Sequence, residues 1–405
     1  MATQIKSKLR APFGVGMMFA SNGAIFAALL PWYPLVAERL GLSSIEFGFI
    51  VASFAVGALL SSALPAPLIA RFGAIKVAIA GTLLLALAIA GAAWAGTGWA
   101  FALCIFLAGF FDAIVDVAQN VAGIRVQDTV QRSILSSMHA LWSLGALLSG
   151  LLATAVAASG FMDMRSYLAL VAVTCVVLVT AGGLLVGQSA SRQDLETKNN
   201  AGSHSRRQLF RLVFLASLPL IVIAICGTVV EDIANNWAAM AGVQIGGLTP
   251  QTAGVVYSVM VGSQCVGRFT GDLLIQRYGS SLVARLGGLL TATGGILVVA
   301  TTGNTLLLFL GLALAGYGSA TLVPSALSAA AKIPGVTEGA GVTLVSWLMR
   351  VGFLATSPII GTVTNSIGLR WGLGALMIVG VATFLLAPSL RTAGEPIAAD
   401  TESLT

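Results

Sequence analysis

The sequence has few charged residues and few of the residues that enzymes use for metal or nucleophilic chemistry. Charged residues make up 9% of the 405 positions, and there are two histidines and four cysteines. The cysteines (Cys104, Cys175, Cys226 and Cys265) lie in apolar runs without paired spacing, so we expect free thiols. The sequence contains no H-E-x-x-H, G-x-S-x-G or G-x-x-x-x-G-K-[ST] pattern. We therefore expect no catalytic residue, no metal site and no cofactor.

Long apolar runs dominate the chain instead. Hydrophobic residues make up 57% of it, and the mean hydropathy is +0.95. Continuous apolar stretches such as Leu168–Val186 recur along nearly the whole length. A hydrocarbon core about 30 Å thick needs about 20 such residues per helix, and backbone groups in lipid must be satisfied within the segment. Because the runs do not alternate with polar residues, we predict an all-α polytopic membrane protein rather than a β-barrel.

The apolar runs predict twelve transmembrane helices and one long polar interruption. The helices are expected at about residues 11–37, 45–70, 75–95, 98–124, 134–158, 164–187, 209–241, 250–276, 281–301, 304–331, 339–366 and 369–388. The polar segment 188–208 is rich in Ser, Asn and charge. We therefore predict a six-helix bundle at 1–187, a cytoplasmic linker at 188–208, a second bundle at 209–388 and a cytoplasmic tail at 389–405.

Lysine and arginine are unevenly distributed between the two sets of alternate loops. Seventeen of the 21 fall in one set together with both tails, three (Arg39, Arg165 and Arg370) fall in the other, and Arg350 lies within a helix. Positive loops stay in the cytoplasm, so both termini are expected there. Since the basic residues are spread over loops, the net charge of +6 does not indicate nucleic-acid binding. Compact loops and the absence of a cleavable signal favour a bacterial inner membrane.

The two halves repeat at an offset of 206 residues. GLSSIEFG at Gly41–Gly48 aligns with GLTPQTAG at Gly247–Gly254, and PLIARFG at Pro67–Gly73 aligns with LLIQRYG at Leu273–Gly279. Both matches fall at the ends of the second helix of each half. Parallel six-helix repeats with a solute site between them are one architecture of transporters.

These features resemble the major facilitator superfamily over nearly the whole chain. Its loop between helices 2 and 3 usually reads G-x-x-x-D-R-x-G-R-R, and here Arg71 and Gly73 match while Ala70 stands where the acid is expected. The resemblance implies a cytoplasmic gate at Arg71 and Gly73 and, in the second half, at Arg268, Asp272 and Arg277. Arg268 and Asp272, four residues apart on one helical face, could form its ion pair.

Three further strings are similar to the fucose-permease-like branch of that family. They are DVAQN at Asp116–Asn120, HALWSLGALLSG at His139–Gly150 and EDIANNW at Glu231–Trp237. The branch includes sugar permeases and members of unassigned substrate, so the resemblance implies no particular solute. It does imply proton coupling.

The fourth predicted helix carries a polar stripe formed by Asp112, Asp116, Gln119 and Asn120. At 1.5 Å per residue, Asp112 lies about 20 Å into the helix, near mid-membrane. Charged residues at this depth are costly and usually face a cavity, so one or both acids are candidates for proton or solute binding. The alternative is a structural role, in which the acids bind neighbouring helices. We favour this alternative more for Asp116 than for Asp112.

The seventh predicted helix carries adjacent acids, Glu231 and Asp232, followed by Asn235 and Asn236. Adjacent residues point about 100° apart, so at most one acid faces the cavity fully. They are candidates for solute or proton binding, or for an outer-gate polar patch. Neighbouring carboxylates in a low-dielectric cavity disfavour simultaneous ionisation, which suits a group that loads and releases a proton.

Three more polar residues complete the candidate site. Asn22 is a candidate cavity group in the first helix, and Arg350 either pairs with a cavity acid, which we favour, or binds an anionic or hydroxyl-rich solute. His139 is favoured as a packing or gating residue over a proton relay. Among the tryptophans, we expect Trp32, Trp94 and Trp99 to be interfacial anchors.

Two classes of function fit these features: a proton-driven secondary transporter that works by alternating access, and a membrane-embedded enzyme or sensor. The paired halves with acids between them favour the transporter. Its partners would be a small solute, protons and the lipid bilayer, and we expect a monomer. Amide residues tilt the choice of solute toward a polar, hydroxylated molecule, and efflux of cationic or amphiphilic compounds is the alternative.

Overall fold

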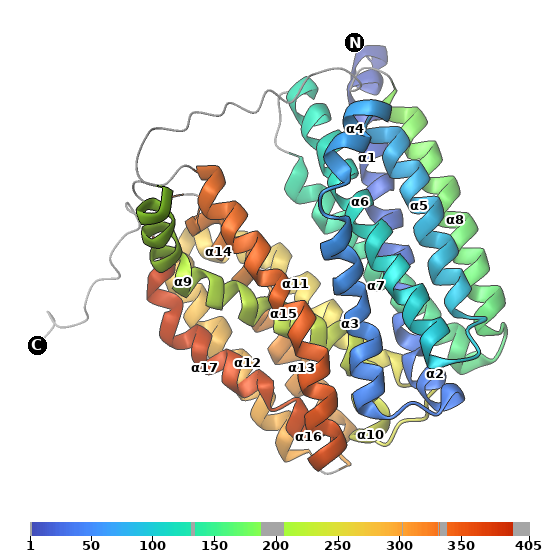
Figure 1. The fold of residues 1–405 in the computed structure, drawn as a ribbon, viewed down its shortest axis with the longest axis vertical. Coiled ribbons are helices and arrows are strands. Elements are labelled where there is room, and N and C mark those ends of the chain that lie inside the picture. Colours follow the sequence, from blue (N-terminus) through green and yellow to red (C-terminus); the bar gives the residue numbers. More distant parts are fainter. Residues whose placement is uncertain are drawn as a thin grey trace, which may run out of the picture.

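The computed structural model describes residues 2–130, 134–187, 206–301, 303–330, 332 and 338–391, and every regular element in these residues is a helix (Figure 1). The first half contains α1 (Ala2–Ala27), η1 (Leu30–Trp32), α2 (Tyr33–Leu40), α3 (Ser44–Ser61), α4 (Pro65–Phe72), α5 (Ala74–Ala92), α6 (Gly98–Val130), α7 (Leu135–Ser159) and α8 (Met164–Val186). The second contains α9 (Arg206–Asp232), η3 (Ile233–Trp237), α10 (Ala238–Gln244), α11 (Gly254–Tyr278), α12 (Ser280–Ala300), α13 (Thr305–Ser319), α14 (Leu322–Ala330), α15 (Glu338–Ile367), α16 (Leu369–Gly372), α17 (Ala375–Leu386) and η4 (Ala387–Leu390). Most of the predicted linker and tail, residues 188–205 and 392–405, lies outside the described residues.

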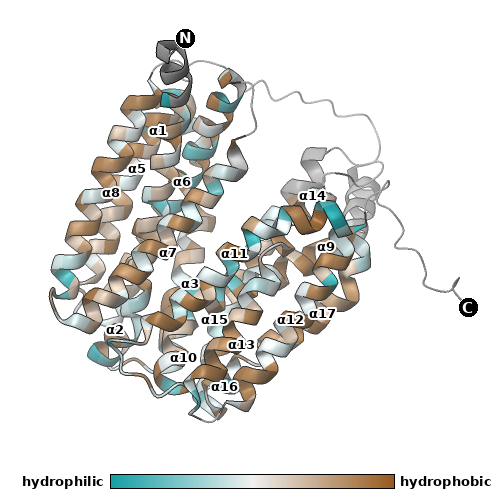
Figure 2. Ribbon diagram, turned by 180° about the vertical axis from the view of Figure 1, so that it is seen from behind, coloured by the Kyte–Doolittle hydropathy of each residue, from teal (hydrophilic) through white to brown (hydrophobic). Residues whose placement is uncertain are grey.

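The described residues form twelve helical spans of membrane length, as predicted. Eleven stretches among the described residues are long and apolar enough to cross a membrane. The twelfth is α11, which has 25 residues but is more polar because it carries Arg268, Asp272 and Arg277. Large apolar side chains such as Leu87, Leu184 and Leu306 are exposed, and Figure 2 shows hydrophobic residues along most of each helix. Such surfaces are stable in lipid rather than in water.

Prolines interrupt three of the spans. The first span breaks between α1 and α2, where Pro31 and Pro34 open the short helix η1 and then α2. The second span was predicted as one helix over 45–70 but consists of α3 and α4, because Pro65 begins a new helix after the turn at 62–64. Proline lacks the N–H that would continue the preceding helix. In the tenth span, Pro324 falls in the first turn of α14, just after the break that ends α13.

The seventh span contains a π-helical turn, η3, at Ile233–Trp237, between α9 and α10. This turn holds Asn235 and Asn236 directly after the acids Glu231 and Asp232. A π turn inserts one extra residue into the helix and is often found at functional sites.

Backbone conformations support the internal repeat. Gly41 and its counterpart Gly247 have φ values of 62° and 68°, and Gly73 and its counterpart Gly279 have φ values of 84° and 82°. Side chains other than hydrogen are disfavoured at such angles, so glycine is required at each position. The matched sequence strings therefore form the same turns in both halves.

The two six-helix groups contact each other through α3 with α15 and through α7 with α11. In Figure 1 the groups approach each other at the end that carries α2, α10 and α16, which we call the sealed side. They diverge toward the end that carries the N-terminus, which we call the open side. On the α3–α15 contact, a Cβ on Gly48 would lie 2.4 Å from the carbonyl oxygen of Ser357, and one on Gly361 would lie 2.5 Å from that of Ser44. The halves therefore meet here backbone to backbone.

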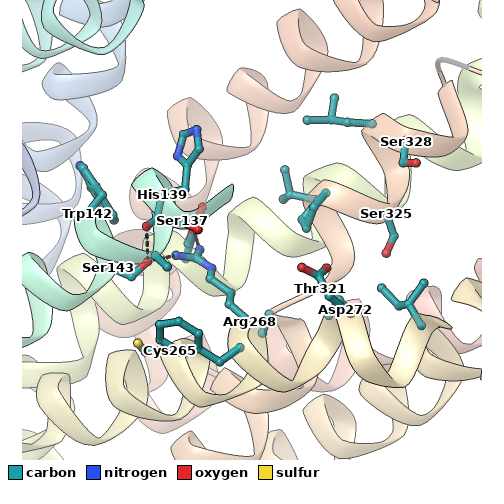
Figure 3. A pocket seen from close by; sticks show the side chains of 18 of the residues that line it. Ser137, His139, Trp142, Ser143, Cys265, Arg268, Asp272, Thr321, Ser325 and Ser328 are labelled. Carbon is teal, nitrogen blue, oxygen red and sulfur yellow. Dashed lines mark hydrogen bonds and ion pairs between the residues drawn. The ribbon is translucent and has the colours of Figure 1, made fainter. Parts of the chain in front are cut away.

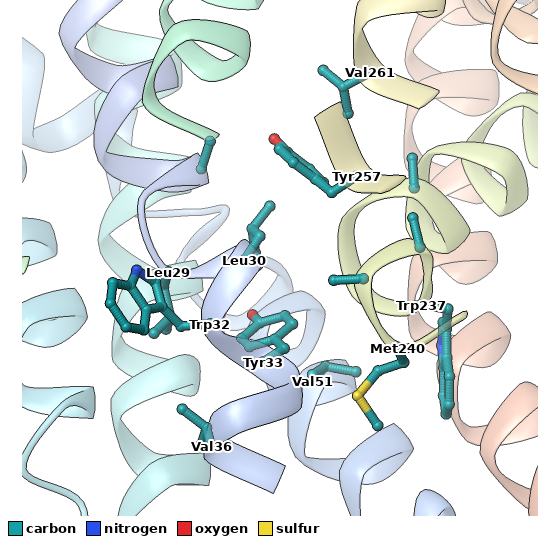
Figure 4. Packing of buried hydrophobic residues seen from close by; sticks show 14 of the residues in the cluster. Leu29, Leu30, Trp32, Tyr33, Val36, Val51, Trp237, Met240, Tyr257 and Val261 are labelled. Carbon is teal, nitrogen blue, oxygen red and sulfur yellow. The ribbon is translucent and has the colours of Figure 1, made fainter. Parts of the chain in front are cut away.

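The sealed side is filled by a buried apolar cluster drawn from both halves. Its members include Phe47. Four further members, Tyr33, Trp237, Met240 and Tyr257, are labelled in Figure 4. Phe47 of α3 packs edge to face on Trp237 of the π turn, with ring centroids 5.4 Å apart. This cluster packs side chains of both halves together on the sealed side, whereas the halves diverge toward the open side.

Candidate functional site

Two connected cavities lie between the halves. The outer one, the vestibule, has a volume of about 870 Å³ and reaches His139, Asp272 and Lys332. The inner one, the central cavity, has a volume of about 300 Å³ and reaches Tyr33, Asp232, Asn235, Tyr257 and Arg350. Six residues line both: Asp112, Asp116, Trp142, Ser143, Glu231 and Arg268. These six therefore form the passage from one cavity to the other.

Asn22 joins three helices at the N-terminal wall of the passage. Its Nδ2 donates to Asp112 Oδ1 on α6 (3.0 Å), and its Oδ1 accepts from Trp142 Nε1 on α7 (2.7 Å) and from Gln119 Nε2 on α6 (3.4 Å). Asn22 is 2% exposed and lines the vestibule, whereas Asp112 lines both cavities. The amide thus orients the Asp112 carboxylate while leaving further acceptor positions on it for a solute or a proton.

Asp116 lies one turn further along α6. Asn120 donates to its carboxylate (3.0 Å) and to its backbone oxygen (2.8 Å), both within the same helix. Asn120 and Gln119 line neither cavity, so these two predicted site residues lie behind the acids rather than in contact with a solute.

The carboxylate of Asp232 is held at the deep end of the central cavity and is 4% exposed. Asn236 Nδ2 donates to its Oδ1 (2.9 Å), and the hydroxyl of Ser357 on α15 donates to its Oδ2. Ser357 Oγ accepts in turn from Trp237 Nε1 (3.0 Å). Because the π turn carries both Asn236 and Trp237, it closes this network around the acid.

Arg268 reaches across the passage (Figure 3). Its Nη2 forms an ion pair with Glu231 Oε1 of α9, and its Nη1 donates to Ser143 Oγ of α7 (2.9 Å). Within the described residues this is the one ion pair. The adjacent acids Glu231 and Asp232 therefore have separate partners, since one faces the passage and the other the α15 interface.

The residues predicted to form the family's gate are distributed over two regions. Arg71 and Arg277 are exposed at the ends of α4 and α11, each stacked over the following ring, at 5.2 Å from Phe72 and 5.4 Å from Tyr278. Gly73 and Gly279 follow them at the equivalent turns. Arg268 does not pair with Asp272, which lies apart from the guanidinium in Figure 3. The four-residue spacing predicted the wrong partner, because the carboxylate of Glu231 on α9 lies closer to the Arg268 guanidinium than that of Asp272 does.

His139 and Arg350 face the cavities. His139 is exposed to the vestibule, with its ring 5.3 Å from that of Phe19. Arg350 lines the central cavity, and no carboxylate of the described residues lies within 4.0 Å of it. The sequence favoured an ion pair between Arg350 and a cavity acid. The described residues form no such pair.

Aromatic side chains line the central cavity from both halves. Phe26, Tyr33 and Trp142 come from the first half, and Tyr257 comes from the second. Tyr257 fits because its ring passes 2.4 Å from where a Cβ on Gly150 would be. Trp94 and Trp99 are exposed as expected of interfacial anchors, but Trp32 is 4% exposed and packs on Tyr167, with ring centroids 5.8 Å apart. The break in the first span turns Trp32 inward.

Three polar site residues were not anticipated from the sequence: Ser143, Ser357 and Gln264. Gln264 is buried at the central cavity and donates to Ser319 Oγ (3.3 Å). Ser143 lies four residues after His139, which places both on one face of α7, and this spacing was a readable signal. Ser357 had none, since serine is common in helix packing. The described residues contain no group of three or more metal-ligating side chains.

These features are those of a membrane transporter with its site between two six-helix bundles. A family model described as Major Facilitator Superfamily matches residues 15–246, more than half of the chain, and the chain belongs to that superfamily. Its membership indicates a transporter rather than an enzyme.

Similar proteins align with nearly the whole length of the chain. An uncharacterized MFS-type transporter of Yersinia pestis is 24% identical over 390 residues, which are 94% of this chain and 98% of that protein. The crystal structure of a D-xylose-proton symporter matches with a TM-score of 0.68 and 16% identity, over 95% of this chain and 97% of that one. The transporter FucP, in the outward conformation, matches with a TM-score of 0.63 and 16% identity, over 96% and 100% of the two chains.

Proposed function

We propose that this protein carries a small, polar, hydroxylated solute across the membrane by alternating access, coupled to protons. The observation that carries this proposal is the central cavity, to which the first half contributes Asp112 and the second contributes Asp232 and Asn235. A cavity lined by both halves changes its contacts when the halves move, and this is what alternating access requires.

The lining of the central cavity supports a hydroxylated solute. Carboxylates and amides provide acceptors and donors, and the faces of Tyr33, Trp142 and Tyr257 provide apolar surface. A volume of about 300 Å³ accommodates one small molecule. The similar structures include a sugar–proton symporter, which agrees with this solute class.

The two carboxylates on α6 support proton coupling. Asp112 and Asp116 both line the passage, and neither has an ion-pair partner within 4.0 Å among the described residues. An unpaired carboxylate in a low-dielectric passage binds a proton readily, and it can release that proton when water reaches it from the other side.

We further propose that the open side faces the cytoplasm of a bacterial inner membrane. The ends of α4 and α11 at that side carry Arg71 and Arg277, in agreement with the loop bias of lysine and arginine. A reporter fused after Thr405 that is active only in the cytoplasm tests this orientation. Activity of a periplasmic reporter at the same site would reverse it.

Transport in proteoliposomes tests the main proposal. Purified protein is reconstituted with a pH-sensitive dye inside, and sugars, polyols and cationic amphiphiles are added separately outside. We expect a hydroxylated solute to drive proton movement in the wild type and not in Asp112→Asn. Glu38→Gln, which alters an exposed acid on α2 outside both cavities, is the matched control. Proton movement driven by cationic amphiphiles and by no hydroxylated solute would favour efflux instead.

A further inference from the structure

Arg350 is a cation that lines the central cavity. No hydrogen bond or ion pair joins its guanidinium to any residue that the structure describes, although the group lines the cavity. The backbone before and after Arg350 on α15 contacts the same residue, Thr228. The hydroxyl of Thr228 on α9 donates to the backbone oxygen of Met349 (3.2 Å), and a Cβ on Gly352 would lie 2.2 Å from Thr228 Oγ1.

The other charged groups of the cavity are already engaged or stand at a distance. Arg268 is held by Glu231 and Ser143, and Asp232 is held by Ser357 and Asn236. Asp116 interacts electrostatically with Arg350, but beyond ion-pair distance. A gap therefore separates the guanidinium from its nearest counter-charge.

An arginine at membrane depth is costly unless its charge and its donors are matched. Guanidinium offers five N–H donors in a planar fork that fits a carboxylate with two parallel hydrogen bonds. Phe353 and Met349 beside Arg350 are apolar, and so is Phe54. They provide no alternative acceptor, so the fork suits an anion brought in by the solute.

The remaining lining indicates what else that solute carries. Asp112, Asn235, Asn236 and Gln264 provide donors and acceptors for hydroxyl groups. The cavity also holds four carboxylates, which disfavours a solute with two or more negative charges. We propose that the solute is a polyhydroxylated monocarboxylate, a sugar acid, whose carboxylate binds Arg350. This inference rests on the proposed function and specifies its substrate class.

Binding of a monocarboxylate also fixes the charge that transport moves. The solute carries one negative charge, and one proton coupled to it, as in the proposed function, balances that charge. Transport of the anion is then electroneutral.

Binding and transport measurements on the full chain test the assignment. The probes are D-gluconate and D-glucuronate, with neutral D-glucose and cationic D-glucosamine as matched controls. Affinities are measured by calorimetry for the wild type in lipid nanodiscs and for Arg350→Gln and Arg350→Lys. Arg370→Gln is the control variant, because Arg370 is exposed on α16 and outside both cavities.

We expect the wild type to bind an acid probe at least about ten-fold more tightly than glucose. Glucose has no carboxylate and so lacks the charge-assisted hydrogen bonds to Arg350. Arg350→Gln should abolish this preference, Arg350→Lys should weaken it, and Arg370→Gln should leave it intact. Equal or tighter binding of glucose or glucosamine, failure of both acids to bind, or an unchanged preference in Arg350→Gln overturns the assignment.

Failure of this assignment and failure of the proposed function are distinguishable. If a neutral sugar drives proton movement in proteoliposomes, the proposed function holds and Arg350 is not a carboxylate site. If an acid binds at Arg350 but moves with no proton, the carboxylate site holds and proton coupling is wrong. A membrane potential imposed with valinomycin should leave uptake of the acid unchanged, since the coupled step carries no net charge.

Discussion

Asn22 on α1 and Asp112 on α6 are joined by one hydrogen bond of 3.0 Å, and the same amide accepts from Trp142 on α7. Three helices of the first half therefore meet at a single buried side chain on the wall of the passage. Moving any of them alters the direction in which the Asp112 carboxylate points.

Replacement of Asn22 by Ala should lower both stability and transport. It leaves the Trp142 N–H and one Asp112 oxygen without a partner, which costs about 1–3 kcal/mol when the groups cannot reach water. The melting temperature in detergent and the rate of uptake measure the two effects. Ser21→Ala is the control, because Ser21 is equally buried and donates only to Met18 O of its own helix (2.9 Å). Equal losses in both variants would contradict a special role for Asn22.

Glu231 and Arg268 should be coupled, and Asp272 and Arg268 should not. Glu231→Gln leaves the Arg268 charge unpaired in the passage, so we expect a lower melting temperature that Arg268→Gln partly restores in the double variant. Since Arg268 is 36% exposed, solvent screening limits the coupling to about 1 kcal/mol.

The same double-mutant cycle with Asp272→Asn in place of Glu231→Gln provides the comparison. We expect no coupling there, because Asp272 lies away from the guanidinium. A larger coupling for Asp272 than for Glu231 would mean that the family's gate pair forms in this chain after all.

Ser357→Ala should destabilise the sealed side. The change removes a donor from the buried Asp232 and an acceptor from Trp237, at a cost of about 1–3 kcal/mol. Thr356→Ala is the neighbouring control, since Thr356 is also buried but donates to Gly352 O of its own helix (2.6 Å). Hydrogen exchange of the peptide that covers the π turn should increase in the first variant and remain near wild type in the second.

Gly361→Val should force the sealed side open. Its Cβ would approach the Ser44 backbone oxygen to 2.5 Å, and backbone atoms cannot move aside as a flexible side chain can. Spin labels at Glu38→Cys on α2 and Arg370→Cys on α16, in a background without the native cysteines, report the separation of the halves. We expect longer distances with Gly361→Val than with Gly96→Val, because no atom lies within 4 Å of a Cβ on Gly96. Identical distance distributions would show that the halves do not separate at this contact.

The spans of the fold were predictable from the sequence because an apolar run of membrane length is a local property. The break near Pro31 and Pro34 within the expected helix 11–37 follows from the same local chemistry, because proline removes a hydrogen bond wherever it stands in a helix. The break before Pro65 was missed, because the apolar run continues through it. The π turn at Ile233–Trp237 depends on packing against α15 and α3, and the sequence carries no sign of it.

The candidate site was predictable in its residue types and less so in its pairing. Asn22, Asp112, Glu231 and Arg350 line the cavities because a polar group in an apolar helix avoids lipid. Their partners come from distant parts of the chain: Arg268 binds Ser143, which is 125 residues away. Spacing along one helix indicates only partners on that helix, and it therefore suggested Asp272 as the partner of Arg268. It gave no indication of Ser143 as a partner of Arg268 or of Ser357 as a partner of Asp232.

The contact of α3 with α15 at Gly48 and Gly361 is made by main-chain atoms, whereas the central cavity is made by side chains. Substitutions that recruit a new cargo need change only the second set. The backbone contact between the two halves can therefore stay constant while the lining of the cavity changes. These two parts of the molecule are free to evolve separately.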